Sequence, residues 1–211
     1  MSTRLLDIYQ ILLDTFGPQY WWPGESPCEV MVGAVLAQNT TWTNVSRAIA
    51  NLKDDNLLSL TALTALPVEL LAERIRPSGY FNQKALRLKN LVLHIEQQHG
   101  DLETFFNQDT LALREELLGL KGIGPETADS IALYAAAKPI FVVDAYTHRI
   151  ASRHNLIAEE ADYDEIQELF MDSLPQDVAL YNEYHALLVR LGKEYCKKST
   201  PRCENCPLKD L

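Results

Sequence analysis

Apolar residues recur every three to four positions along most of the chain, which is the spacing of amphipathic helices. The first such stripe ends at Gly17-Pro18 and consists of Leu5, Ile8, Leu12 and Phe16. Glu29–Gln38 is almost entirely apolar, which predicts a helix that is buried on all sides. Cys28, directly before this segment, is expected to be a small core residue.

Start and stop residues predict the remaining helices. These run from Thr41 to about Leu52, from Pro67 onward, from Gly79 to about His99, from Asp109 to about Leu118, and from Pro125 to about Ala137. In the helix that ends at His99, the side chains expected to point inward are Leu86, Leu88, Leu91, Val92 and Ile95. Asp162 and Glu165 have the spacing of a capping box, which predicts a further helix.

Only Ile140–Val143 resembles a strand, and it is too short to build a sheet. No repeat of 20–50 residues is present, which argues against a helical solenoid. The expected fold class is therefore all-α.

The composition is that of a globular protein, with 211 residues of which 47% are hydrophobic and 23% charged. No apolar run approaches the ~20 residues of a membrane helix, and the first residues do not resemble a signal peptide. We therefore expect a cytoplasmic protein with no membrane partner. The net charge of −10 argues against a protein that coats nucleic acid through bulk charge. Residues 74–95 nevertheless hold five basic residues and no acid, which permits a local positive face.

A turn between two predicted helices spans Gly122-Ile123-Gly124. Two glycines allow the backbone to approach a ligand closely, and N–H groups at the start of the next helix favour an anion. The turn therefore suits a phosphate group, while a tight turn between packed helices is the alternative. The residues placed at this contact are Lys121, Gly122, Ile123 and Gly124.

The three tryptophans of the chain lie in two short segments, Tyr20-Trp21-Trp22-Pro23 and Gln38-Asn39-Thr40-Thr41-Trp42. Enzymes that act on a base extrude it and commonly hold it by stacking. Indole faces also attract cations, and alkylation at a purine ring nitrogen produces a cationic base. The alternative is that these tryptophans belong to the core.

The segment Leu-x-Gly-Ile-Gly-x-x-Thr-Ala, followed about twenty residues later by Val142-Val143-Asp144, resembles the helix-hairpin-helix (HhH-GPD) DNA glycosylases, the superfamily of endonuclease III. The resemblance covers essentially the whole chain. It implies two helical lobes with the active site in a cleft between them. One lobe would span residues 21–135, with the hairpin at about 111–137; the other would join residues 1–20 to 136–211.

The resemblance implies a catalytic role for Asp144, because the family's aspartate at this place is catalytic. Breaking an N-glycosidic bond develops positive charge on the sugar, and a nearby carboxylate stabilises that charge. Asp144 can also cap the helix that begins at Ala145, and both roles are compatible. Bifunctional members have a lysine two residues after the last hairpin glycine, where this chain has Glu126. A carboxylate cannot form an imine, so AP-lyase activity is not expected.

Trp-Trp-Pro, Gln-Asn-Thr and Lys-Gly-Ile-Gly-x-Glu-x-Ala-Asp look most like the 3-methyladenine DNA glycosylase III branch. That resemblance implies a sandwich of the extruded base between Trp42 and either Trp21 or Trp22, in a pocket that Pro23 and Glu126 complete. Gln38 and Tyr80 match the two residues that relatives insert into the duplex, although an exposed turn tyrosine is the alternative for Tyr80.

Three cysteines crowd the C-terminal segment in the pattern Cys196-x6-Cys203-x2-Cys206. Thiolates at such spacing bind iron–sulfur clusters or zinc. The pattern resembles the start of the endonuclease III cluster loop, whose fourth cysteine would fall at position 212, directly after Leu211. We expect a [4Fe-4S] cluster, with zinc or a loop without metal as alternatives, because the branch that the pocket resembles can lack the cluster.

The residues and the resemblance together predict a monomeric, nucleoid-associated, monofunctional DNA glycosylase that removes an alkylated purine from double-stranded DNA. One alternative is an endonuclease III-like glycosylase for oxidised pyrimidines or mismatches. The other is a non-catalytic helix-hairpin-helix protein that only binds DNA.

Overall fold

The computed structural model describes residues 2–211, and all regular structure in these residues is helical, as expected. No helix in the described range is long and apolar enough to cross a membrane. Contacts divide the chain into two compact units. We call residues 1–22 with 139–211 the terminal unit, and residues 23–138 the central unit. The boundaries predicted from the sequence, residues 21 and 135, lie two to three positions earlier than these.

The terminal unit contains α1 (Ser2–Phe16), α10 (Ala145–Arg153), α11 (Tyr163–Ser173), α12 (Val178–Glu194) and the short 3-10 helix η3 (Cys203–Asn205). Helix α12 packs against α1 and α10, and α1 also contacts α11. The core is aromatic: the Phe141 ring stacks on Phe170 with centroids 4.2 Å apart, and Tyr184 meets both rings edge-on. Buried Tyr184 donates its hydroxyl proton to the carbonyl of Leu5 at 2.8 Å, which ties α12 to α1.

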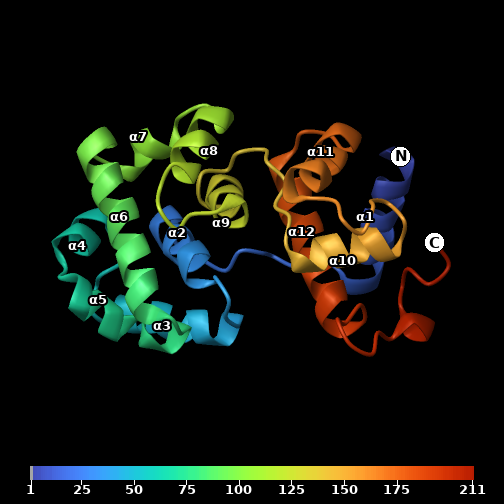
Figure 1. Cartoon of the computed structure of the whole chain (residues 1–211), viewed down its shortest axis with the longest axis horizontal. Coiled ribbons are helices and arrows are strands. Elements are labelled where there is room, and N and C mark those ends of the chain that lie inside the picture. Colours follow the sequence, from blue (N-terminus) through green and yellow to red (C-terminus); the bar gives the residue numbers. More distant parts are fainter. Residues whose placement is uncertain (1) are drawn as a thin grey trace. The chain divides into compact units, whose positions relative to one another are not determined.

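The central unit contains α2 (Pro27–Leu36), α3 (Trp42–Asp54), α4 (Leu60–Ala65), α5 (Val68–Arg74), η1 (Arg76–Ser78), α6 (Phe81–His99), α7 (Leu102–Phe106), α8 (Thr110–Leu118), α9 (Pro125–Ser130) and η2 (Ile131–Ala135), which is a π-helical turn. Residues Cys28–Leu36 of α2 are all buried. The predicted burial of this segment is therefore confirmed, and α2 lies between α6 and α9 as the centre of the unit (Figure 1).

Several boundaries differ from the expected ones. Helix α2 begins at Pro27, because Ser26 accepts a hydrogen bond from the N–H of Glu29 and caps the helix two residues early. Pro67 precedes α5 as its cap instead of forming its first residue. Helix α9 changes to a π-helical turn at Ile131. Helices α4 and α7 have only five or six residues, too few for a periodic pattern to identify them.

One prediction of an inward-pointing side chain in α6 is wrong. Leu86 of α6 is 54% exposed, because its neighbours Ala85 and Leu88 occupy the buried stripe of the helix. The capping box of Asp162 and Glu165 is present at the start of α11. Cys28 is buried as predicted, and burial, followed by the charge of Glu29, raises the pKa of its thiol to about 11.

Candidate functional site

Asp144 ends a buried extended segment and caps α10. Its Oδ1 atom accepts hydrogen bonds from the N–H groups of Tyr146 at 2.9 Å and Thr147 at 2.7 Å, and from the Thr147 hydroxyl at 3.0 Å. These bonds satisfy N–H groups that the first turn of a helix otherwise leaves without partners. They also fix the orientation of the carboxylate. All three end on Oδ1, and none of them uses Oδ2.

His185 of α12 approaches that second oxygen, with Nε2 3.6 Å from Asp144 Oδ2. Both side chains are about nine-tenths buried. Burial raises the pKa of Asp144, but His185 and the bonds from Thr147 outweigh it and hold the pKa below its ordinary value. Asp144 is therefore an ionised carboxylate at neutral pH in a mostly dry environment.

His185 was not predicted from the sequence as part of this site, and it lies 41 positions after Asp144. A signal was available, since His185 interrupts an otherwise apolar buried run in α12, Ala186-Leu187-Leu188 following it directly. Buried histidines need a polar partner.

A glycine allows α10 and α12 to approach closely at this site. A Cβ atom at Gly192 of α12 would lie 2.2 Å from Cδ1 of the Tyr146 ring, which is closer than real carbon contacts. Tyr146 is the second residue of α10 and donates its N–H to Asp144. The absence of a side chain at Gly192 therefore sets the position of the helix start that holds the carboxylate.

The predicted hairpin is present in the central unit between α8 and α9. Gly122 has φ of +93°, a region that L side chains rarely adopt, and its missing Cβ leaves space for the Arg87 side chain. Gly124, by contrast, has an ordinary φ and no atom within 4 Å of an added Cβ. Ile123 is buried and anchors the turn, while Lys121 and both glycines are exposed.

An ion pair joins the two helices of the hairpin. Arg114 Nε of α8 lies 2.8 Å from Oδ1 of Asp129 in α9, and Asp129 is fully buried. Breaking such a pair leaves a buried charge without compensation, so the pair fixes the relation of the two helices.

Gln38 follows α2 and contacts the hairpin. Its amide donates to the Thr127 hydroxyl at 2.9 Å and to the Gly122 carbonyl at 3.1 Å, and it accepts from Arg87. Tyr80 lies in the turn before α6 with a left-handed φ of +46°, and its side chain is 69% exposed. Both residues that were predicted to enter a duplex are therefore in the central unit, Gln38 just after α2 and Tyr80 just before α6.

The tryptophan segments fall in different units. Trp21 and Trp22 belong to the terminal unit, as Asp144 does, and their ring centroids are 5.5 Å apart at an angle of 58°. Trp21 lines a cavity of about 280 Å³ beside α12, with Lys193 Nζ 6.0 Å from its ring centroid. The other predicted pocket residues are in the central unit: exposed Pro23, Trp42 as the first residue of α3, and exposed Glu126 in the first turn of α9. The base sandwich itself stays a prediction.

The three C-terminal cysteines line one cavity of about 220 Å³ in the terminal unit, together with Arg153 and His154. Arg153 Nη1 lies 3.3 Å from Cys196 Sγ, and Arg149 donates to the Cys196 carbonyl at 2.7 Å. A set of thiols beside a guanidinium suits an anionic thiolate site, because the arginine offsets part of the negative charge. The donors fit an iron–sulfur cluster or zinc.

Comparison with known proteins shows the family. The model of the HhH-GPD superfamily base excision DNA repair proteins matches residues 32–176. The chain is 51% identical over 206 residues to a candidate DNA repair glycosylase of Methanocaldococcus jannaschii, MJ1434, covering 97% of this chain and 93% of that protein. It is 30% identical over 184 residues to endonuclease III of Thermotoga maritima, covering 87% and 81% of the two chains.

A solved structure is also similar. The Helicobacter pylori 3-methyladenine DNA glycosylase MagIII, bound to 1,N6-ethenoadenine, has a TM-score of 0.76 and 33% identity over 91% of this chain and 97% of its own. The resemblance to the 3-methyladenine glycosylase III branch is therefore seen in both sequence and fold. The chain belongs to the HhH-GPD superfamily of base excision DNA repair proteins.

Proposed function

We propose that the protein is a monofunctional DNA glycosylase that hydrolyses the N-glycosidic bond of an alkylated purine in duplex DNA. The observation that carries the proposal is Asp144, a buried and ionised carboxylate with one oxygen fixed by three hydrogen bonds. The similarity to MagIII, whose structure holds an ethenoadenine, supports a modified purine as the substrate.

The chemistry follows from the charge that develops as the bond breaks. The departing base takes the bonding electrons, and the sugar becomes oxocarbenium-like. A carboxylate fixed in a site of low polarity stabilises this cation more than it would in water, and it orients the attacking water. His185, 3.6 Å from Asp144 Oδ2, acts as a positioning residue that keeps the carboxylate ionised.

Glu126 supports a hydrolytic and monofunctional reaction. It occupies the hairpin position where bifunctional relatives have a lysine, and a carboxylate cannot form the imine that starts strand cleavage. The product is then an intact strand with an abasic site. Glu126→Lys should introduce a complex with abasic DNA that borohydride traps, while Glu126→Gln should not.

The hairpin supports binding to the DNA backbone. Lys121 is exposed beside Gly122 and Gly124, where backbone N–H groups can reach a phosphate. Gln38 and Tyr80 are proposed to enter the duplex, with Trp42 and Trp21 or Trp22 holding the extruded base by stacking.

The cysteine loop is proposed to hold a [4Fe-4S] cluster through Cys196, Cys203 and Cys206, in a structural role. Iron and acid-labile sulfide, measured per chain in protein purified without oxygen, test this. About four of each support the cluster, whereas zinc or neither would contradict it.

The function is tested with methylated duplex DNA, with the released bases separated by chromatography and strand nicking measured with and without alkali. We expect 3-methyladenine or another methylpurine, and nicks only after alkali. Release of oxidised pyrimidines instead would favour an endonuclease III-like activity. The relative from Thermotoga maritima is named endonuclease III. Binding without release of any base would contradict glycosylase activity.

A further inference from the structure

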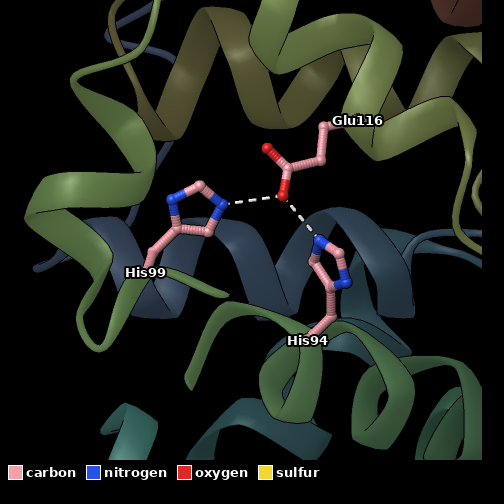
Figure 2. A group of neighbouring side chains, drawn as sticks. All are labelled: His94, His99 and Glu116. Atoms are coloured by element: carbon pink, nitrogen blue, oxygen red, sulfur yellow. Dashed lines mark hydrogen bonds and ion pairs between the residues drawn. The ribbon is translucent and has the colours of Figure 1, made fainter. Parts of the chain in front are cut away.

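Two histidines and a glutamate meet in the central unit, and none of the three has a role in the site described above. His94 and His99 lie near the C-terminal end of α6, and Glu116 lies on α8. Figure 2 shows both imidazole rings pointing at the same carboxylate oxygen. His94 Nε2 and His99 Nε2 are 2.5 and 2.7 Å from Glu116 Oε1. The three donor atoms all lie within 4.8 Å of one another.

Neighbouring groups fix the orientation of the carboxylate and of one ring. Gln108 donates to Glu116 Oε2 at 2.8 Å and to the Phe105 carbonyl at 3.1 Å, so Oε2 is held and Oε1 faces the histidines. The Phe105 ring meets His99 edge-on with centroids 5.2 Å apart. Hydrogen bonds of this kind to a ligating carboxylate are typical of metal sites.

We propose that His94, His99 and Glu116 bind a divalent first-row transition-metal ion, with Zn²⁺ as the best match. Imidazole nitrogen and carboxylate oxygen are preferred zinc ligands, and a site with two histidines and a glutamate leaves a fourth position for water. The three side chains are 16–28% exposed, so an ion can enter from solvent.

The site needs only a small rearrangement to accept the ion. With metal–ligand bonds of about 2.0–2.1 Å in tetrahedral geometry, ligand atoms lie about 3.3 Å apart. The nitrogen–oxygen distances of 2.5 and 2.7 Å must therefore widen by roughly 0.6–0.8 Å, which a small rotation of the partly exposed imidazoles supplies.

Metal at this site would join the end of α6 to α8, the first helix of the hairpin. Helix α8 also holds α9 through Arg114 and Asp129. Ion binding would therefore stabilise the hairpin against unfolding, since a ligand that binds only the folded state adds RT ln(1 + [L]/Kd) to the free energy of unfolding. Its metal is separate from any metal in the cysteine loop, because the histidines and the glutamate belong to the central unit and the three cysteines to the terminal unit.

Co²⁺ titration of the full chain tests the proposal, because its absorption distinguishes thiolate ligands from nitrogen and oxygen ligands. We expect a bound Co²⁺ without thiolate charge transfer, displaced by Zn²⁺. Glu116→Gln and His99→Gln should each lower the affinity for Co²⁺ at least about tenfold. Loss of a residue that only hydrogen-bonds to a metal ligand commonly has an effect of this size. His148→Gln, which removes a histidine from α10, is the matched control and should bind normally.

Zn²⁺ should also raise the midpoint of thermal unfolding, and the increase should be larger for the wild-type chain than for Glu116→Gln. If Glu116→Gln does not fold, Gln108→Ala keeps all three ligands and should still weaken Co²⁺ roughly tenfold or more. Cobalt bound with thiolate absorption alone, or equal affinity in the wild type and the three site variants, would overturn the proposal. None of these readouts depends on glycosylase activity.

Discussion

At the scale of single residues, Asp144 combines a structural task with the proposed catalytic one, and substitution by asparagine separates them. The amide oxygen of Asn can still accept the N–H groups of Tyr146 and Thr147, so α10 keeps its cap. The negative charge is lost, and we expect base release to fall on the order of 10²–10³-fold. Single-turnover base release and thermal unfolding measure the two effects.

Asp162→Asn is the matched control, because Asp162 caps α11 in the same way. It should change thermal stability as little as Asp144→Asn and leave base release intact. Equal base release by both variants would show that Asp144 is only a cap.

Lys84 shows how a charge in the sequence can be absent from the surface. Lys84 is one of the five bases of residues 74–95 that were expected to permit a positive face, yet it is 1% exposed. Its Nζ atom donates to the carbonyls of Ser78 at 2.7 Å and Leu36 at 2.9 Å. Burial, with a smaller contribution from Arg87, lowers its pKa from 10.5 to about 8.

This lowered pKa predicts a dependence of stability on pH. Between pH 8 and 10.5 the unfolded chain binds the Lys84 proton while the folded chain releases it, so the free energy of unfolding rises with pH. Over that window the gain is up to about 3 kcal/mol. Urea unfolding at several pH values should show this gain in the wild type and not in Lys84→Met. Parallel pH profiles of the two proteins would contradict the assignment.

At the scale of elements, the two hairpin glycines have different reasons to be glycine, and alanine at each should separate folding from binding. Gly122→Ala places a Cβ 2.6 Å from the Arg87 side chain at a φ of +93°, so it should destabilise the central unit by about 1 kcal/mol or more. Gly124→Ala meets no atom within 4 Å and should unfold like the wild type. Its methyl group would obstruct a phosphate, so duplex affinity should fall.

Thermal unfolding and fluorescence anisotropy with a labelled duplex measure the two effects on each variant. An unchanged affinity of Gly124→Ala would show that DNA does not approach the hairpin turn. A normal unfolding midpoint for Gly122→Ala would show that the turn tolerates a side chain.

The elements also show what a sequence can reveal. Most helices could be predicted from the sequence, because capping residues and periodic apolar positions depend only on residues a few positions apart. The capping box of Asp162 and Glu165 is an example. Leu86 was wrongly predicted to be buried. The periodic apolar stripe shows that one face of the helix is buried, but it does not show how far the neighbouring helices extend over the edges of that face. His185 beside Asp144, and Glu116 beside His94 and His99, join positions 17–41 residues apart, and such contacts exist only once the chain has folded.

At the scale of the whole molecule, a net charge of −10 has to be reconciled with a DNA substrate. The proposed grip combines backbone N–H groups of the hairpin with Lys121, so that lysine and arginine side chains neutralise only a few phosphates. Since each phosphate neutralised by a basic side chain contributes about −0.9 to the slope of log Kobs against log salt, we expect a shallow slope of roughly −2 to −4.

Lys121→Ala should weaken binding to all duplexes alike and reduce the magnitude of that slope by about 1. Lys53→Ala is the control, because the Lys53 ammonium is already paired with Glu25 and Glu29 at 3.0 Å and has little charge to offer DNA. Anisotropy titrations at four or five salt concentrations measure both slopes. A wild-type slope near −8 would mean that a broad basic surface binds the duplex. An unchanged slope in Lys121→Ala would show that the phosphate contact is not at the hairpin, and it would contradict the proposal that the hairpin holds the DNA backbone.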